Sequence, residues 1–208
     1  MNFNKMKLNY KNFEIELSYN ICKESNSNND LIQYKKIYLS NSNSEDTTKH
    51  VIIIKESGIK ISNAKIYGVG SFSGIFLNSF ILEHDKIWML GGNKVYCLDI
   101  PFLELLWYKE FDLHSNFSIY KLEEDFIIHG ESQIFRISKE GEIVWSFAGR
   151  DIWFNMEGEP ELTIETNTIR LFDFVSNEYV LDFNGNLIED NSRIIAPVTK
   201  KKLWKIFG

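Results

Sequence analysis

Cysteine, proline and long apolar runs are all scarce in this sequence. Its 208 residues include two cysteines, Cys22 and Cys97, which excludes a framework of disulfide bonds and favours a reducing compartment. No segment approaches the roughly 20 consecutive apolar residues that a membrane-spanning helix needs. The N-terminal segment contains lysines but no apolar run of signal-peptide length. We therefore expect a soluble cytoplasmic protein.

Alanine is also rare, and the three prolines leave few rigid breaks. Aromatic residues, in contrast, make up 14% of the chain, with 16 Phe, nine Tyr and five Trp. Aromatic and β-branched side chains favour the pleated, half-buried surface of a sheet over a helix. The composition predicts one all-β domain, which a chain of this length can form with a sizeable core.

Charge is unevenly distributed along the chain. The net charge of −6 divides into +1 over residues 1–110, −11 over residues 111–193 and +4 over residues 194–208. An acidic body repels phosphate backbones, which argues against nucleic-acid binding, but it suits a cationic protein partner. Solvation of the surface alone is the other interpretation of this acidity.

Three regions follow from the polar breaks and the hydrophobic pattern. We expect residues 1–49 to hold N-terminal strands with two polar loops, because alternating apolar residues around Phe13 are followed by the Asn- and Ser-rich segments 23–30 and 40–49. Residues 50–190 are expected to form repeated β-modules within the same domain. Residues 191–208 form a basic C-terminal tail, for which a packed end and a short membrane-surface anchor are both possible. We expect no membrane partner.

The repeat appears when segment 81–111 is aligned with segments 121–147 and 169–189. A weaker early copy is 51–62. Turns at Gly58, near residue 101, at Gly141 and at Gly185 give a period of about 40 residues. Glycine accepts the positive φ that tight hairpins need. The pairs that align at an offset of 39 are Ile87 with Phe126, Gly91 with Gly130, Val95 with Ile134 and Leu98 with Ile137.

Tryptophan recurs with the same spacing. Trp107 aligns with Trp145 at an offset of 38, so we expect the two to be equivalent core positions that seal adjacent modules. The third copy has Glu189 or its neighbours at this place. The fold class is therefore all-β, built from antiparallel modules of about 40 residues that form a propeller-like or open stacked array.

The segments KVYCLDIPFLELLW and QIFRISKEGEIVW resemble the blade consensus of quinoprotein-type (PQQ-like) β-propellers, in which an aromatic-aliphatic strand, a Gly turn and a Trp recur. The resemblance covers about residues 80–190. It departs from the family because the chain has room for four or five modules instead of eight blades, and because the third copy lacks the Trp. It implies an architecture of stacked hairpins and does not imply the cofactor.

Catalytic and metal-binding patterns are not recognisable. The four histidines stand singly, without the spacing of metal ligands, and Cys97 lies within an apolar strand. We expect no metal, no cofactor and no small-molecule ligand. Enzymatic activity is left open, because a carboxylate-based glycosidase needs only two suitably placed acids, whose separation a sequence does not show.

The candidate binding surface combines acidic residues with the segment WSFAGRDIWFNMEG (145–158). Trp and Arg are enriched in interface hot spots, and Glu at alternating positions of an extended segment would project from one face. The alternatives are a tight connection in which Arg150 pairs with an acid, and a solvated acidic loop. The candidate residues are Glu123, Glu124, Asp125, Arg150, Asp151, Trp153, Glu157, Glu159 and Glu161.

We expect a non-catalytic protein-binding protein, and within that class a small bacterial immunity-type protein that neutralises a basic toxin through an acidic-aromatic surface. One alternative is a carboxylate-based hydrolase acting on a carbohydrate. The other is a structural repeat module of a larger assembly.

Overall fold

Every element of the described chain is a β-strand. The computed structural model describes residues 5–22, 34–38, 47–69, 75–154 and 160–192. Strands make up more than half of residues 50–190, as the sequence predicts. No helix that is long and apolar enough to cross a membrane occurs in these ranges. The basic tail from residue 193 and most of the two polar loops lie outside the described residues.

The first sheet has five strands in the order β1-β2-β4-β5-β3. All neighbours are antiparallel except β3 and β5, which are parallel. The early copy at 51–62 is indeed a hairpin that turns at Gly58, but it pairs with the N-terminal strands instead of forming a module of its own. The strands are β1 (Lys5–Tyr10), β2 (Phe13–Cys22), β3 (Lys36–Tyr38), β4 (Thr47–Glu56) and β5 (Ile59–Val69).

Three four-stranded antiparallel sheets follow, each a simple meander. The repeated unit thus begins at Phe80, later than residue 50. The strands of these sheets are β6 (Phe80–Glu83), β7 (Lys86–Gly91), β8 (Lys94–Asp99) and β9 (Leu105–Glu110); β10 (Asn116–Leu122), β11 (Asp125–Gly130), β12 (Ile134–Ile137) and β13 (Ile143–Phe147); and β14 (Leu162–Ile164), β15 (Thr168–Phe172), β16 (Glu178–Asp182) and β17 (Leu187–Asn191).

The strand register confirms the repeat. The pair Ile87–Leu98 in the second sheet corresponds to Phe126–Ile137 in the third and Ile169–Leu181 in the fourth. Each of the three sheets also has a register shift at the same place between its last two strands. The predicted turn glycines Gly58, Gly141 and Gly185 all have positive φ, between 78° and 82°.

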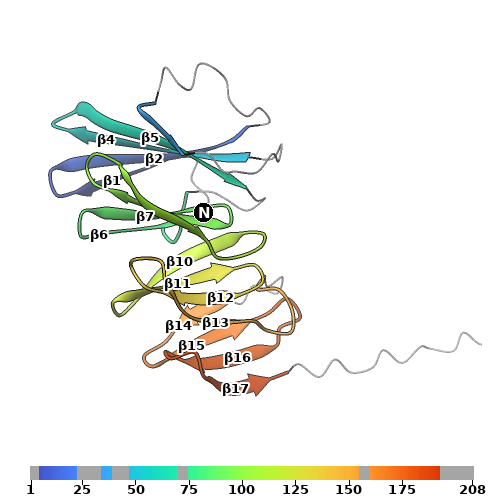
Figure 1. Ribbon diagram of the computed structural model, residues 1–208. Helices are drawn as coiled ribbons and strands as arrows, with labels where there is room; N and C mark the ends of the chain where they lie inside the picture. Colours follow the sequence, from blue (N-terminus) through green and yellow to red (C-terminus); the bar gives the residue numbers. More distant parts are fainter. Residues whose placement is uncertain (1–4, 23–33, 39–46, 70–74, 155–159, 193–208) are drawn as a thin grey trace, which may run out of the picture.

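The four sheets lie one above another, with the first sheet at the top of Figure 1 and β14–β17 at the bottom. Three hydrophobic cores separate them, one between each pair of neighbouring sheets. A single hairpin could not bury its apolar face, so the stacking of sheets supplies the burial that stabilises each module.

Tryptophan on the outer strand of a module reaches the turn of the next module. Trp107 on β9 donates its Nε1–H to the Lys139 carbonyl at 3.1 Å, and Trp145 on β13 donates to the Phe183 carbonyl at 2.9 Å. Their rings lie against Gly141 and Gly185, where a Cβ would approach the ring to 3.0 and 2.7 Å. The two tryptophans are therefore equivalent, as predicted, although each is partly and not fully buried.

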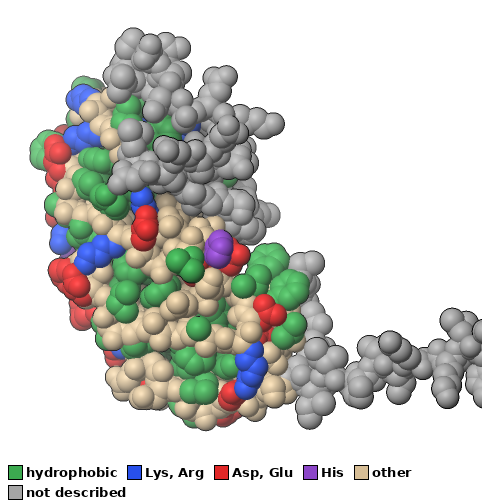
Figure 2. Space-filling model, turned by 45° about the vertical axis from the view of Figure 1, so that its right-hand side comes forward, with side chains coloured by type: hydrophobic (Ala, Val, Ile, Leu, Met, Phe, Trp, Pro, Cys, Tyr) green, Lys and Arg blue, Asp and Glu red, His purple; other side chains and the backbone are tan. Residues whose placement is uncertain are grey.

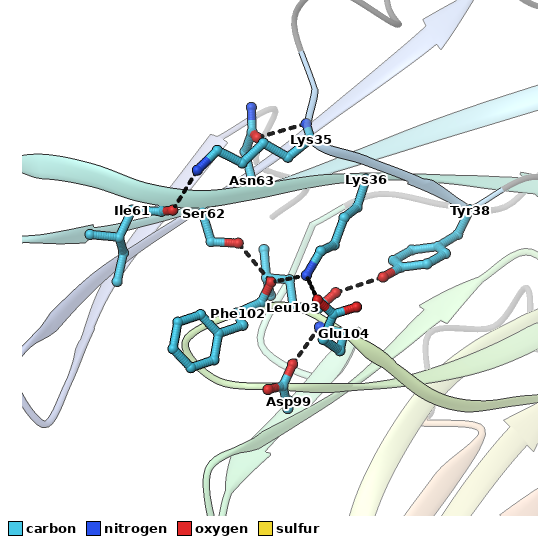
Figure 3. Close-up of polar contacts among 10 residues, drawn as sticks. All are labelled: Lys35, Lys36, Tyr38, Ile61, Ser62, Asn63, Asp99, Phe102, Leu103 and Glu104. Carbon is cyan, nitrogen blue, oxygen red and sulfur yellow. Dashed lines mark hydrogen bonds and ion pairs between the residues drawn. The ribbon is translucent and has the colours of Figure 1, made fainter.

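The first sheet is joined to the second by polar contacts with the turn between β8 and β9 (Figure 3). The Ser62 hydroxyl and the Lys36 ammonium both donate to the Phe102 carbonyl, and the Tyr38 hydroxyl donates to the Leu103 carbonyl at 2.6 Å. Lys36 also pairs with Glu104. Leu103 itself is fully buried in the first core, so this turn packs between the first and second sheets.

The face of the fourth sheet that points away from the third sheet differs from the corresponding face of the third sheet. In the third sheet this face packs on the fourth and carries Ile127, Ile134, Trp145 and Phe147. The same register positions in the fourth sheet are Arg170, Glu178, Glu189 and Asn191. Arg170 forms ion pairs with Glu165 and Glu178, and Asn191 donates to Glu178 at 3.0 Å. A polar network thus replaces the apolar contact surface.

His50 on β4 is buried beneath the first sheet without a hydrogen bond. Its side chain is 1% exposed, its ring lies 5.5 Å from the Tyr19 ring, and neither ring nitrogen has a hydrogen-bond partner in the described part of the chain. Burial disfavours the charged form and lowers the pKa of His50 to about 4.

We expect acidification to destabilise the protein through His50. Because the folded-state pKa lies below that of an unfolded histidine, near 6.5, the contribution is fully present above that pH and is lost as pH falls toward 4. The loss between pH 7 and pH 5 should be about 2 kcal/mol. Urea unfolding at the two pH values measures it. Over the same pH interval, the free energy of unfolding of the His50→Leu variant should fall by about 2 kcal/mol less than that of the unmodified protein. An equal fall in both proteins would contradict the assignment.

Candidate functional site

The loops at one end of the stack form a continuous surface, which we name the connecting-loop face. Strand direction alternates, so the links between modules meet the β7–β8, β11–β12 and β15–β16 turns at this end, and the remaining hairpin turns lie at the other. Within the described chain the face consists of residues 75–79, 92–93, 111–115, 131–133, 148–154, 160–161 and 173–177.

Backbone hydrogen bonds tie these loops together across the modules. Asn116 donates to Gly92, Glu131 to Ser115, Trp153 to Glu131 and Phe174 to Ile152, all at 2.8–2.9 Å. The loops therefore behave as one framework, in which a residue of one module is placed relative to its neighbours in the next.

Large apolar side chains stand exposed along this face. Leu77, Leu113, Ile152 and Phe174 are exposed to 77%, 85%, 37% and 42%. These residues occupy loops of different length and are not equivalent positions of the repeat, so the packing of the modules does not require them. Figure 2 shows hydrophobic side chains beside acidic ones and a histidine on the side that includes this face. Exposed apolar residues gathered in loops mark a surface available for binding.

Arg150 lies at the edge of the face in a fixed position. Its guanidinium makes two hydrogen bonds to the Asp190 carboxylate, at 2.7 and 2.6 Å, and a third to the Tyr179 hydroxyl at 3.1 Å. This pairing holds the pKa of Asp190 below its usual range. Of the interpretations of this segment, the structure favours a tight connection in which Arg150 pairs with an acid.

Trp153, predicted as an exposed anchor, is fully buried. Its ring packs against Phe147 and Tyr179 in the third core, with centroids 6.0 and 5.4 Å away. Its carbonyl accepts a hydrogen bond from His129 Nε2 at 3.0 Å. The prediction was wrong because the loop turns inward after Asp151, so that Trp153 fills the space between two sheets and Ile152 faces out.

The acidic run Glu123, Glu124 and Asp125 does not belong to this face. It forms the β10–β11 turn, at the opposite end of the strands from Arg150 and Trp153. Arg136 pairs with Glu123 and Asp125 at 2.9 and 2.7 Å. Lys139 pairs with Glu124 at 2.7 Å. The predicted single acidic-aromatic surface is therefore split between the two ends of the stack.

Of the remaining acidic candidates, Asp151 and Glu161 fall near the connecting-loop face. Asp151 is exposed, and its carboxylate accepts the Ile152 N–H at 2.8 Å. Glu161 is half-buried at the start of β14, where its carbonyl accepts the Phe172 N–H at 3.0 Å. Glu157 and Glu159 lie outside the described residues.

Sequence reasoning missed the residues that shape the loops. Asp112 and Asp173 are buried, accept several backbone N–H bonds and are each followed directly by an exposed apolar residue. An Asp side chain commonly accepts the backbone N–H two residues further on and so favours a turn. The pairs Asp112–Leu113 and Asp173–Phe174 carry that signal in the sequence.

Burial and ion pairing perturb the pKa values of several titratable groups in the described chain. No group of three His, Cys, Asp or Glu residues in the described ranges could hold a metal ion. Burial raises the pKa of the Cys97 thiol to about 12 and lowers the pKa of His129. Cation pairing or hydrogen bonding to the charged form lowers the carboxyl pKa of several acids, whereas a general acid needs a raised one. The acids so affected are Glu16, Glu83, Glu124, Glu165, Asp182 and Asp190.

No protein-family model matches the chain, and no curated protein matches it. Among solved structures, the AfRom2 CNH domain is similar with a TM-score of 0.48 and 8% sequence identity. The match covers 85% of this chain and 50% of that chain, so the chain spans about half the length of that structure. A likeness at this level carries no information about function.

Proposed function

We propose that this is a non-catalytic protein-binding protein that takes a basic protein partner at its connecting-loop face. The observation that carries the proposal is the set of exposed apolar side chains on that face, which the repeat does not require. In protein interfaces a few residues carry most of the binding energy, and the contacts around them exclude water.

The charge of the face supports a basic partner. Its loops contain Asp112, Glu131, Asp151, Glu161 and Asp173, and Arg150 is their one Lys or Arg side chain within the described residues. That arginine is already paired with Asp190. An acidic field of this kind accelerates the encounter with a cationic protein and disfavours an acidic one.

Neutralisation of a basic toxin, as in a bacterial immunity-type protein, is the narrower form of this proposal. A rigid acidic and apolar face could cover the basic catalytic or nucleic-acid-binding surface of such a toxin. A toxin gene directly upstream would support this form, and a sugar operon in that place would favour the carbohydrate hydrolase instead.

Capture from native lysate followed by association kinetics tests the proposal. We expect the Glu131→Lys/Asp151→Lys double variant to lower the association rate constant by about tenfold at low salt, and salt to slow the unmodified protein markedly. The Phe174→Ala variant should instead raise the dissociation rate constant by at least about tenfold, because it removes an anchor.

Glu124→Lys is the matched control, since Glu124 is an exposed acid at the opposite end of the stack. It should leave both rate constants unchanged. An acidic captured partner, an association rate that ignores salt, or equal effects of Glu124→Lys and the Glu131→Lys/Asp151→Lys double variant would contradict the proposal. Capture of a carbohydrate or nucleotide in place of a protein would favour a ligand-binding or enzymatic function.

A further inference from the structure

Asp112 fixes the loop that presents Leu113. Its carboxylate is buried, with Oδ1 accepting the His114 N–H at 3.0 Å and Oδ2 accepting the N–H groups of Ser132 and Gln133 at 2.8 and 3.1 Å. One side chain thereby links the connection between modules to the β11–β12 turn. Leu113 lies between the linked residues 112 and 114, and its side chain is 85% exposed.

Asp173 does the same for Phe174. It is fully buried, with Oδ1 accepting the Asn177 N–H at 2.8 Å and Oδ2 accepting from Asn177 Nδ2 and the Tyr179 hydroxyl at 2.9 and 3.0 Å. The next residue, Phe174, donates its N–H to the Ile152 carbonyl at 2.8 Å. Phe174 is therefore held beside Ile152 on the connecting-loop face.

The repeat does not explain this agreement. Asp112 lies in the link between β9 and β10, whereas Asp173 lies in the turn between β15 and β16, so the two are not equivalent positions. Each nevertheless combines a buried carboxylate, backbone donors and an exposed apolar neighbour. Two loops that are not equivalent in the repeat thus share these three features, although Asp112 bonds to a neighbouring turn and Asp173 bonds mainly within its own loop.

We infer that Asp112 and Asp173 are positioning residues of the binding face, which hold Leu113 and Phe174 in the orientation that a partner contacts. The inference rests on the proposed function. Rigid presentation strengthens binding because the loop and its side chain lose less conformational freedom when the complex forms. Both aspartates act through the neighbouring side chain and need not touch the partner.

A double-mutant cycle tests this action. The full-length Asp112→Asn, Leu113→Ala and combined variants are compared for dissociation from the basic protein recovered by capture, once that protein is identified and purified. Asp112→Asn should raise the dissociation rate constant about threefold to tenfold when Leu113 is present and have no further effect when it is absent. The cycle Asp173→Asn with Phe174→Ala should behave in the same way.

Additive effects in both cycles would overturn the inference and leave the proposed function standing, because the aspartates would then act on the fold in general. Failure to recover any basic protein that depends on Phe174 would overturn the proposed function itself. Hydrogen exchange of the unmodified protein gives a measurement without substitutions. The amides of Ser132, Gln133 and Asn177 should exchange slowly, and exchange as fast as that of the exposed turn residue Glu124 would contradict the positioning role.

Discussion

Replacing the partly buried Trp145 with alanine is expected to lower the free energy of unfolding by about 3 kcal/mol, at the lower end of the range for large aromatic side chains, since truncation removes apolar contacts and leaves a cavity. The ring joins two modules, because it packs in the third core and its Nε1–H is bonded to the Phe183 carbonyl. The substitution therefore weakens both packing and a hydrogen bond between neighbouring sheets. Urea denaturation of the variant and the unmodified protein gives the difference.

Ile143→Ala is the control for this experiment. Ile143 lies on the same strand, but its side chain is exposed, so its truncation should change stability far less. Trp107→Ala should resemble Trp145→Ala, because the two residues are equivalent in the strand register. An unchanged midpoint for both tryptophan variants would show that they do not seal the modules.

Gly185→Ala should destabilise the protein by about 2–5 kcal/mol for two separate reasons. The residue has a φ of 82°, a conformation that disfavours a side chain by about 1–2 kcal/mol. The added Cβ would also approach the Trp145 ring to 2.7 Å, which forces one of them to move and adds an overpacking penalty of about 1–3 kcal/mol. Thermal or urea unfolding measures the combined loss.

Gly58→Ala separates the two contributions. Gly58 has nearly the same φ, 80°, but a Cβ there would meet nothing within 4 Å, so only the backbone penalty should remain. The combined Trp145→Ala/Gly185→Ala variant should also lose less than the sum of its single changes, because the clash disappears with the ring. Equal losses of stability for Gly58→Ala and Gly185→Ala would show that the Trp145 ring moves aside without an energetic penalty.

The repeat could be predicted from the sequence because it depends on local rules. Alternating apolar residues and a glycine that accepts positive φ determine a hairpin from its own residues, so Gly141 and Gly185 mark turns in the structure as they do in the sequence. Trp107 and Trp145 occupy equivalent positions in the strand register, and Glu189 occupies that position in the third copy.

The candidate site was harder to predict because it depends on contacts between distant segments. Whether Trp153 or Ile152 points outward depends on the path of one loop between two sheets, and both are apolar. The acids at 123–125 and at 161 belong to one acidic region of sequence, yet strand direction separates them to opposite ends of the stack. The parallel pairing of β3 with β5 likewise joins two segments that are separated in the sequence, and no local pattern predicts that they pair.

The polar face of β14–β17 that points away from the third sheet affects whether copies of this protein stack on one another at high concentration. Units that stack through apolar faces would continue to add head to tail, as a fibre does, if the last face were as apolar as the ones before it. Here Arg170 and its carboxylate partners occupy that face, and another copy packing on it would have to strip water from these charges. The charges on this face of β14–β17 thus oppose apolar stacking of a second copy on it.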